Sequence, residues 1–143
     1  FGRNRQFRRA QRKFSVSDAS YAQSEYVLVV EGLFAFAHFT AMGYGPSTVA
    51  LLGSELLSGK VDILADIGRP IVWFTDNDIA GQSCLYGRIE TETGEHNWRG
   101  ALHAMRHNVA QFVPTYPDWT DDPDDLTRDD VERMIAEAEL YAG

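Results

Sequence analysis

The chain has 143 residues, of which 44% are hydrophobic and 24% charged, and its formal net charge at pH 7 is −8. These values are ordinary for a globular protein and suffice for one domain with its own core. No apolar run approaches the length that spans a bilayer, no signal peptide is recognisable, and the single cysteine, Cys84, excludes an internal disulfide and a cysteine-based zinc site.

Basic residues are concentrated at the amino-terminal end of this acidic chain. Six of the thirteen precede the first acidic residue: Arg3, Arg5, Arg8, Arg9, Arg12 and Lys13. We expect residues 1–25 to form a basic arm, or the tail of a preceding subdomain, that contacts a phosphate backbone with salt-sensitive affinity. A merely solvated arm is an equal alternative. Because the chain opens on Phe1, we also expect it to be a fragment or a processed product.

Buried strands alternate with helices in the first half of the chain. A first strand is expected at 26–31, because its Val/Leu run at 27–30 has no polar alternation, which is typical of a parallel strand buried on both faces. The apolar residues 33–42 predict a short buried helix. A second strand is expected at 47–52, a helix at 54–67 from its periodicity, and a third strand at 71–75.

The second half of the chain continues this alternation. A helix is expected at 79–86, an exposed loop or small hairpin at 88–97, a helix at 98–107, a fourth strand at 109–113, a loop at 114–125 and a last helix at 127–140. Thr127 and Asp130 have the spacing of a capping box at the start of that last helix. The whole order predicts an α/β domain with a mostly parallel, four-stranded sheet flanked by helices.

Acidic residues directly follow two of the expected strands. Glu31, with Gly32 after it, ends the first strand, and Asp76 and Asp78 follow the third. In an open α/β sheet such strand ends border the ligand crevice, and carboxylate oxygens suit a hard divalent cation. An Asp-x-Asp triplet alone is more often a turn or a helix cap, but its place after a strand, together with Glu31-Gly32 after the first strand, favours a metal site.

Four segments resemble a known family, the Toprim domain of primases, topoisomerases, recombination-repair proteins and some nucleases. Three of them are the strand with Glu31-Gly32, residues 49–53 and residues 74–81. The fourth, residues 122–126 with Asp122-Pro123-Asp124, resembles the Asp-Pro-Asp segment of DnaG-type primases. The resemblance implies a Toprim-like, Rossmann-like fold with a catalytic core at 26–126, an insertion at about 88–97 and a C-terminal helix at 127–143.

The resemblance also implies an activity, that of a phage or bacterial DNA primase. Such a DNA-directed RNA polymerase makes RNA primers on single-stranded DNA by nucleotidyl transfer that depends on Mg²⁺ or Mn²⁺. The implied catalytic residues are Glu31, Asp76 and Asp78, the implied metal ligands are these three with Asp122 and Asp124, and the glycines beside the phosphates are Gly32, Gly53 and Gly81. The expected partners are the template, nucleoside triphosphates and a replicative helicase or other replication subunit, with no membrane, in the cytoplasm of a bacterial cell or phage-infected host.

Two departures from the family pattern leave alternatives open. Ala35 stands where such primases often carry an acid, so one metal ligand is absent or supplied elsewhere. A zinc ribbon and a template-binding subdomain would have to lie on another segment or a partner. Asp122 and Asp124 fit a solvated turn equally well. A metal-dependent nuclease and a non-catalytic assembly module of a replication or transcription complex are therefore the competing functions.

Two further patterns have plain structural interpretations. Residues 53–60 approach the phosphate-loop pattern, but the spacing is one residue too long and Val61 replaces the required Ser or Thr. We therefore reject that motif. His38, on an apolar helix, is expected to be a packed core histidine, and Trp73 is expected in the core.

Overall fold

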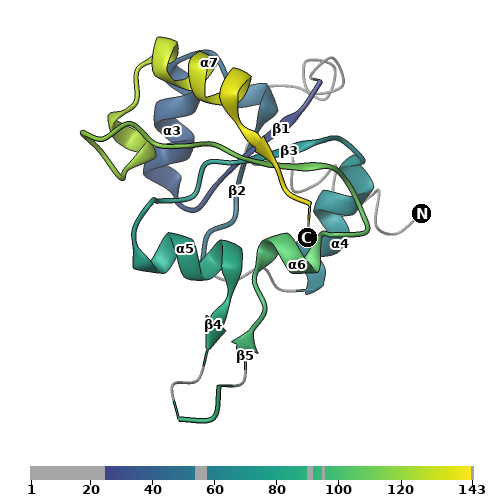
Figure 1. Ribbon diagram of the computed structural model, residues 1–143. Helices are drawn as coiled ribbons and strands as arrows, with labels where there is room; N and C mark the ends of the chain where they lie inside the picture. The colour runs from purple at the N-terminus through teal and green to yellow at the C-terminus, as the bar shows by residue number, and fades with distance from the viewer. Residues whose placement is uncertain (1–24, 54–57, 90–91, 95, 143) are drawn as a thin grey trace.

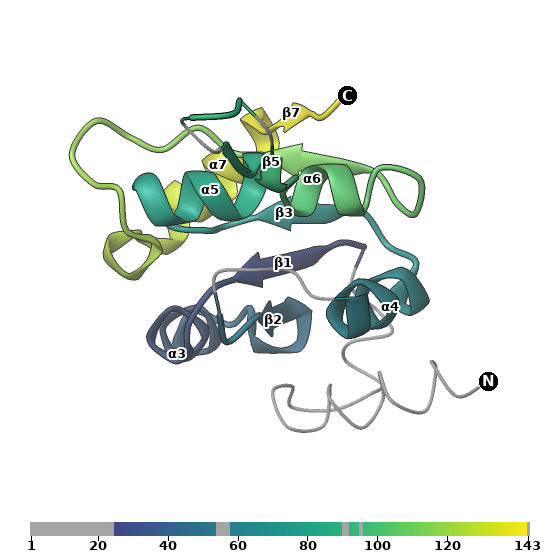
Figure 2. The same ribbon diagram turned by 90° about the horizontal axis from the view of Figure 1, so that it is seen from below.

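A five-stranded sheet forms the centre of the chain. The computed structural model describes residues 25–53, 58–89, 92–94 and 96–142. The sheet consists of β1 (Val27–Val30), β2 (Thr48–Ala50), β3 (Ile71–Trp73), β6 (Gln111–Val113) and β7 (Glu139–Leu140). Their order is β2-β1-β3-β6-β7, as Figure 2 shows from β2 to β7. The first four strands are parallel, and β7 runs antiparallel to β6.

Helices cover both faces of this sheet. They are α3 (Leu33–Ala41), α4 (Ser58–Ile67), α5 (Ile79–Tyr86), α6 (Ala101–Ala104) and α7 (Arg128–Glu137), with 3₁₀ turns η1 (Gly45–Ser47) and η2 (Pro123–Asp125). Helices α3 and α7 pack on one face, and α4, α5 and α6 pack on the other (Figure 1). The chain moves from β1 to β2 in one direction across the sheet and returns past β1 to β3. Right-handed crossovers then require α3 and α4 to lie on opposite faces.

The strands are apolar throughout because both of their faces are buried. Val27 and Val29 point into the layer under α4, α5 and α6, whereas Leu28 and Val30 point toward α3 and α7, and all four are fully buried. Trp73 is in the core, as expected, and its indole Nε1–H donates a 3.0 Å hydrogen bond to Oε1 of Gln111. None of the described helices has the length and apolar character needed to cross a membrane.

A hairpin projects from the helical layer after α5 (Figure 1). Its strands, β4 (Arg88–Ile89) and β5 (His96–Trp98), pair antiparallel within the segment expected to be a loop or small hairpin. The helix predicted from residue 98 was too long, because Trp98 belongs to β5 and α6 begins only at Ala101. Between them Gly100 has a φ of +90°, and a Cβ there would lie 2.2 Å from the carbonyl oxygen of Leu85.

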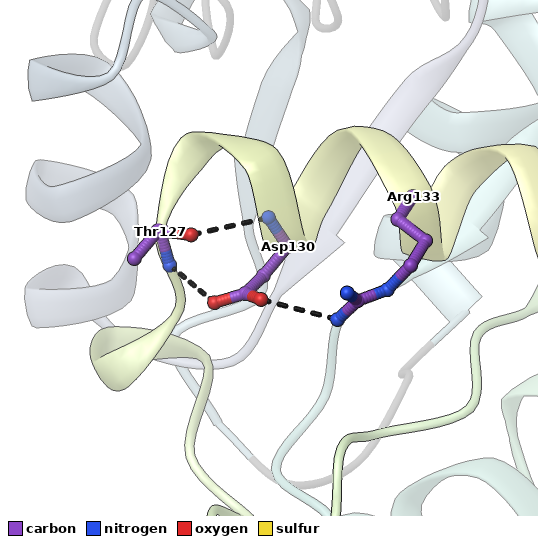
Figure 3. Close-up of polar contacts among 3 residues, drawn as sticks. All are labelled: Thr127, Asp130 and Arg133. Atoms are coloured by element: carbon purple, nitrogen blue, oxygen red, sulfur yellow. Dashed lines mark hydrogen bonds and ion pairs between the residues drawn. The ribbon is translucent and has the colours of Figure 1, made fainter.

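The last helix begins as predicted and ends early. Thr127 accepts a 3.1 Å hydrogen bond from the amide of Asp130, whose carboxylate accepts one from the amide of Thr127 at 2.9 Å (Figure 3). Asp130 also contacts Arg133 at 3.1 Å. The predicted extension to residue 140 is wrong, since the helix ends at Glu137 and residues 139–140 form β7, a fifth strand. Pairing with the open edge of β6 satisfies backbone groups that a helix would have left unpaired on that strand.

The remaining predicted elements are present, with ends that differ by a few residues. The helix expected to be buried, α3, buries Ala35 and Phe39 but leaves Leu33 and Phe34 exposed, because only one of its faces packs on the sheet. Residues 1–24 and 54–57 lie outside the described residues. The basic residues of the predicted arm fall there: Arg3, Arg5, Arg8, Arg9, Arg12 and Lys13. Their interpretation as a nucleic-acid contact therefore stays a prediction.

Candidate functional site

Acidic residues from three distant segments meet at the carboxyl edge of the sheet. Glu31 follows β1, Asp76 follows β3, Asp122 is the N-cap of the η2 turn after β6, and Asp124 lies within that turn. From β1 the chain continues to β2 on one side, and from β2 it returns to β3 on the other side of β1. The switch point of the sheet therefore lies between the neighbouring strands β1 and β3. Such a switch point opens a crevice beyond the strand ends, which is where ligands bind in open α/β sheets.

Hydrogen bonds hold these three segments together. The amide of Asp76 donates to Oε1 of Glu31 at 2.9 Å, which joins the ends of β1 and β3. The amide of Asn77 donates to the carbonyl oxygen of Asp121 at 2.7 Å, and its side-chain Nδ2 donates to Oδ1 of Asp121 at 3.1 Å. The loop that carries Asp122 is thereby tied to the end of β3.

The acids line a common cleft with a volume of about 370 Å³. Its lining residues are Glu31, Gly32, Phe34, Ala35, Gly53, Asp76, Asp122 and Asp124. Four of the eight carry a carboxylate and none is basic. The cleft is therefore a strongly negative environment that favours a cation, or a ligand that brings cations with it.

Burial and mutual repulsion disfavour the charged forms of these acids. Burial, and then the carboxylate of Asp122, raise the pKa of Asp76 to about 6. Burial also raises the pKa of Glu31, although the hydrogen bond from the Asp76 amide opposes the shift. The pKa of Asp124 is raised by burial and by Asp122 and lowered by His38. A cation in the cleft would relieve the repulsion among these carboxylates.

Two side chains that were not predicted as site residues form hydrogen bonds to the backbone next to the acids. Tyr116 donates its hydroxyl to the carbonyl oxygen of Thr75 at 2.8 Å, and burial followed by the nearby carboxylates raises the pKa of Tyr116. His38 is half-buried rather than a core residue, and its Nε2 donates to the carbonyl oxygen of Leu126 at 2.7 Å. His38 therefore links α3 to η2. Only the polarity of His38 on an otherwise apolar helix could have signalled this role.

Asp78 occupies a different position from the other predicted ligands. Its Oδ1 accepts a 2.8 Å hydrogen bond from the amide of Gly81 and thereby caps α5. Its side chain lines a neighbouring groove along α5 that also includes Ile79 and Tyr86, and it does not line the acidic cleft. Asp78 is still close enough for its charge to raise the pKa of Glu31 and Asp76.

The three predicted glycines have different surroundings. Gly32 and Gly53 line the cleft, and a Cβ on Gly32 would meet no atom within 4 Å. Gly81 does not line it. A Cβ on Gly81 would lie 1.6 Å from the carbonyl oxygen of Asp76, so glycine is required there by the contact between α5 and the end of β3. Gly81 was predicted to lie beside the phosphates, and in the structure its open side is filled by the backbone of Asp76.

The chemistry of the cleft fits a hard divalent cation. All the charged side chains that line the cleft are carboxylates, and Oδ1 of Asp124 is buried without a hydrogen-bond partner. Among the described side chains, no three Asp, Glu, His or Cys residues are grouped closely enough to hold an ion by themselves. This suits Mg²⁺, which usually keeps several waters and is held by one or two carboxylates together with substrate phosphates.

Comparisons with known proteins identify one similar fold. No protein-family profile matches the chain, and no curated protein matches its sequence. A solved structure described as "Structure of the DnaG primase catalytic domain bound to ssDNA" matches with a TM-score of 0.57 and 21% identity, over 83% of this chain and 35% of that one. The chain thus spans about a third of that protein's length. It has an α/β fold similar to part of the DnaG primase catalytic domain.

Proposed function

We propose that the chain is a Toprim catalytic domain of a DNA primase, of phage or bacterial origin. It would join ribonucleotides into primers on single-stranded DNA. The observation that carries this proposal is the cleft in which Glu31, Asp76, Asp122 and Asp124 meet at the switch point of the sheet. The similar fold of the DnaG primase catalytic domain supports it independently of those residues.

The metal ligands proposed within the cleft are Glu31, Asp76, Asp122 and Asp124. Asp78 would contribute through its charge and by capping α5 unless its carboxylate leaves that cap. When bound, Mg²⁺ or Mn²⁺ neutralises phosphate charge and stabilises the attacking and leaving oxygens of a phosphoryl transfer. The donor set fits this role because it is entirely carboxylate and includes the unpartnered Oδ1 of Asp124.

As an alternative to binding the metal, Glu31 would accept the proton that leaves the primer 3′-hydroxyl. Its Oε1 is occupied by the amide of Asp76, so the carboxylate is held in one orientation and Oε2 is the oxygen left for the hydroxyl. Burial raises the pKa of Glu31, and a base works best when its pKa approaches the working pH. The link between Asn77 and Asp121 would keep the acids of η2 facing this proton acceptor.

Template binding is proposed to involve other parts of the machinery. The similar structure was solved with single-stranded DNA and is much longer than this chain. We propose that single-stranded DNA and nucleoside triphosphates are the ligands, and that a zinc-ribbon or template-binding segment and a helicase or other replication subunit assist. The predicted basic arm at residues 1–25 would contact the nucleic-acid backbone.

The direct test is extension of a short RNA primer annealed to a DNA template, with ribonucleotides and Mg²⁺. A preformed primer removes the need for the initiation steps that a separate segment would perform. The wild-type chain should add nucleotides, and Glu31→Gln, Asp76→Asn and Asp122→Asn should each reduce the rate by at least about 100-fold, the usual scale for an essential catalytic group. Asp129→Asn, in the first turn of α7 outside the cleft, is the matched control.

Wild-type rates in all three cleft variants would remove the proposed site. The same cleft suits a metal-dependent nuclease, which would shorten labelled DNA or RNA in Mg²⁺ or Mn²⁺ without nucleotides. Ala35 supports a third possibility, the non-catalytic assembly module, because this buried residue lines the cleft where related primases often carry an acid. In that case divalent cations should not change the melting temperature.

A further inference from the structure

The acidic cleft lacks a positive charge of its own for a phosphate ligand. Its lining includes four carboxylates and no basic residue. Lys60, on α4, lies just beyond the lining at the Gly53 turn. Its Nζ is 3.4 Å from the position that a Cβ of Gly53 would occupy. The ammonium group therefore lies beside a residue that lines the cleft. A phosphate chain that extends from the acids toward Gly53 would need a cation at this position.

This position of Lys60 does not depend on a phosphate-loop motif. The rejected pattern at residues 53–60 requires Lys to follow a loop of fixed length, and that length is wrong here. In the structure, the proximity arises because the turn after β2 and the first half of α4 lie side by side. The Lys60 ammonium is thus placed beside a residue that lines the cleft.

An exposed aromatic ring borders the same cleft. Phe34, in the first turn of α3, is 84% exposed, whereas Phe39 on the same helix and Phe74, directly after β3, are fully buried. Phe34 lines the cleft together with the acids. A phenyl ring left in water beside carboxylates offers a flat surface for stacking, and the face of a nucleobase is the matching shape.

We propose that Lys60 and Phe34 make the cleft a site for a nucleoside triphosphate, with Lys60 contacting the phosphate chain and Phe34 stacking on the base. This inference rests on the proposed function, because the acids of that function hold the Mg²⁺ that accompanies the nucleotide. It goes further by assigning separate parts of the ligand to two residues that have no carboxylate and take no part in the chemistry.

Because the two contacts involve different parts of the ligand, two probes separate them. ATP has a base and three phosphates, whereas inorganic tripolyphosphate has only the phosphates. Titration calorimetry in Mg²⁺ should show that Phe34→Ala weakens ATP binding by about tenfold, the scale of one stacked base, and leaves tripolyphosphate binding unchanged. Lys60→Ala should weaken the binding of both ligands by a similar factor. Phe34→Trp and Lys60→Arg should restore the wild-type affinities.

Two matched controls lie away from the cleft. Leu140→Ala removes another exposed apolar side chain, from β7 at the far edge of the sheet, and Arg106→Ala removes a cation next to the amino end of β6. Both variants should bind ATP and tripolyphosphate like the wild type. A loss in either control of the same size as in the cleft variants would indicate a general effect of charge or stability and overturn the assignments.

The result for each residue is decisive in either direction. Unchanged ATP affinity in Phe34→Ala overturns the stacking role, and unchanged tripolyphosphate affinity in Lys60→Ala overturns the phosphate role. A wild-type chain that binds neither ligand overturns both. The primase proposal is judged separately by primer extension: the expected binding pattern without extension would leave the nucleotide site standing and remove the polymerase. Normal primer extension with an unchanged nucleotide KM in Phe34→Ala and Lys60→Ala would support the polymerase and overturn the nucleotide-binding roles of the two residues.

Discussion

The amide of Asp76 donates a 2.9 Å hydrogen bond to Oε1 of Glu31, although 45 positions separate the two residues in the chain. The contact joins the ends of β1 and β3, which are neighbours in the sheet. Glu31 therefore has two separable properties, an oxygen that accepts this hydrogen bond and a negative charge that faces the cleft.

These two properties can be separated by substitution. Glu31→Gln keeps a side-chain oxygen for the Asp76 amide but removes the charge, so its metal-free stability should stay close to that of the wild type. Glu31→Ala leaves the amide without its acceptor and should lower the free energy of unfolding by about 1–2 kcal/mol. Both variants should lose stabilisation by Mg²⁺, which for the wild type reaches about 2.7 kcal/mol at 100 times the Kd. Chemical unfolding with and without Mg²⁺ measures both effects, and undiminished Mg²⁺ stabilisation in Glu31→Gln would contradict the proposed ligand role.

The charge of Asp76 should make the metal-free protein less stable as pH rises. Its pKa is about 6 in the folded state, against an ordinary value of 3.8, so between these values the folded protein binds more protons than the unfolded chain. Stability from this group is therefore lost as pH rises from about 4 to 6 and stays low above that. Asp76→Asn should remove this dependence and be more stable than the wild type at pH 7 by about 1 kcal/mol, the full shift being reduced by solvent screening.

Urea unfolding of both proteins at several pH values, without divalent cations, measures this difference. The stability of Asp76→Asn relative to the wild type should grow through the same pH window and then level off. A difference that shrinks as pH rises would mean that the carboxylate is stabilised in the fold, which is the opposite of the shift caused by burial and Asp122.

Gly81 should tolerate no side chain. A methyl group there would lie 1.6 Å from the carbonyl oxygen of Asp76, so Gly81→Ala must push α5 away from the end of β3. We expect a loss of about 3 kcal/mol or more, because the contact is with backbone and cannot be relieved by a rotamer change. Gly59→Ala in α4, where a Cβ meets nothing within 4 Å, is the matched control and should be neutral or stabilising by up to about 1 kcal/mol. Equal thermal stabilities of the two variants would refute this packing argument.

His38 should affect metal binding without contacting the ligand. Its hydrogen bond to the carbonyl oxygen of Leu126 holds η2 against α3, and η2 carries Asp122 and Asp124. His38→Ala should cost about 1 kcal/mol of stability from the lost hydrogen bond and should also weaken Mg²⁺ binding severalfold. Thr40→Ala, which removes an exposed hydrogen bond within α3, is the control expected to leave Mg²⁺ binding unchanged. A His38 variant with reduced stability but normal Mg²⁺ affinity would show that the histidine is only structural.

The alternation of elements and the acids at the strand ends could be predicted from local patterns. Continuous apolar runs such as residues 27–30 need no distant information, because a strand buried on both faces excludes polar residues at every position. The capping box of Thr127 and Asp130 is likewise local and was predicted correctly. The end of the same helix was not, because residues 139–140 become a strand only when the edge of β6 lies beside them.

Local sequence by itself determined that carboxylates would follow β1 and β3 and that a sheet would bring them to one edge. Only the tertiary structure decided which side chains face the shared cleft. Asp78 turns to cap α5, Gly81 packs on the carbonyl of Asp76, Phe34 on α3 lines the cleft, and Lys60 on α4 lies beside its lining residue Gly53. The physical reason is that the local pattern of apolar residues determines where a strand ends. The direction of a side chain depends instead on hydrogen-bond partners and packing neighbours, many of which are distant in the chain.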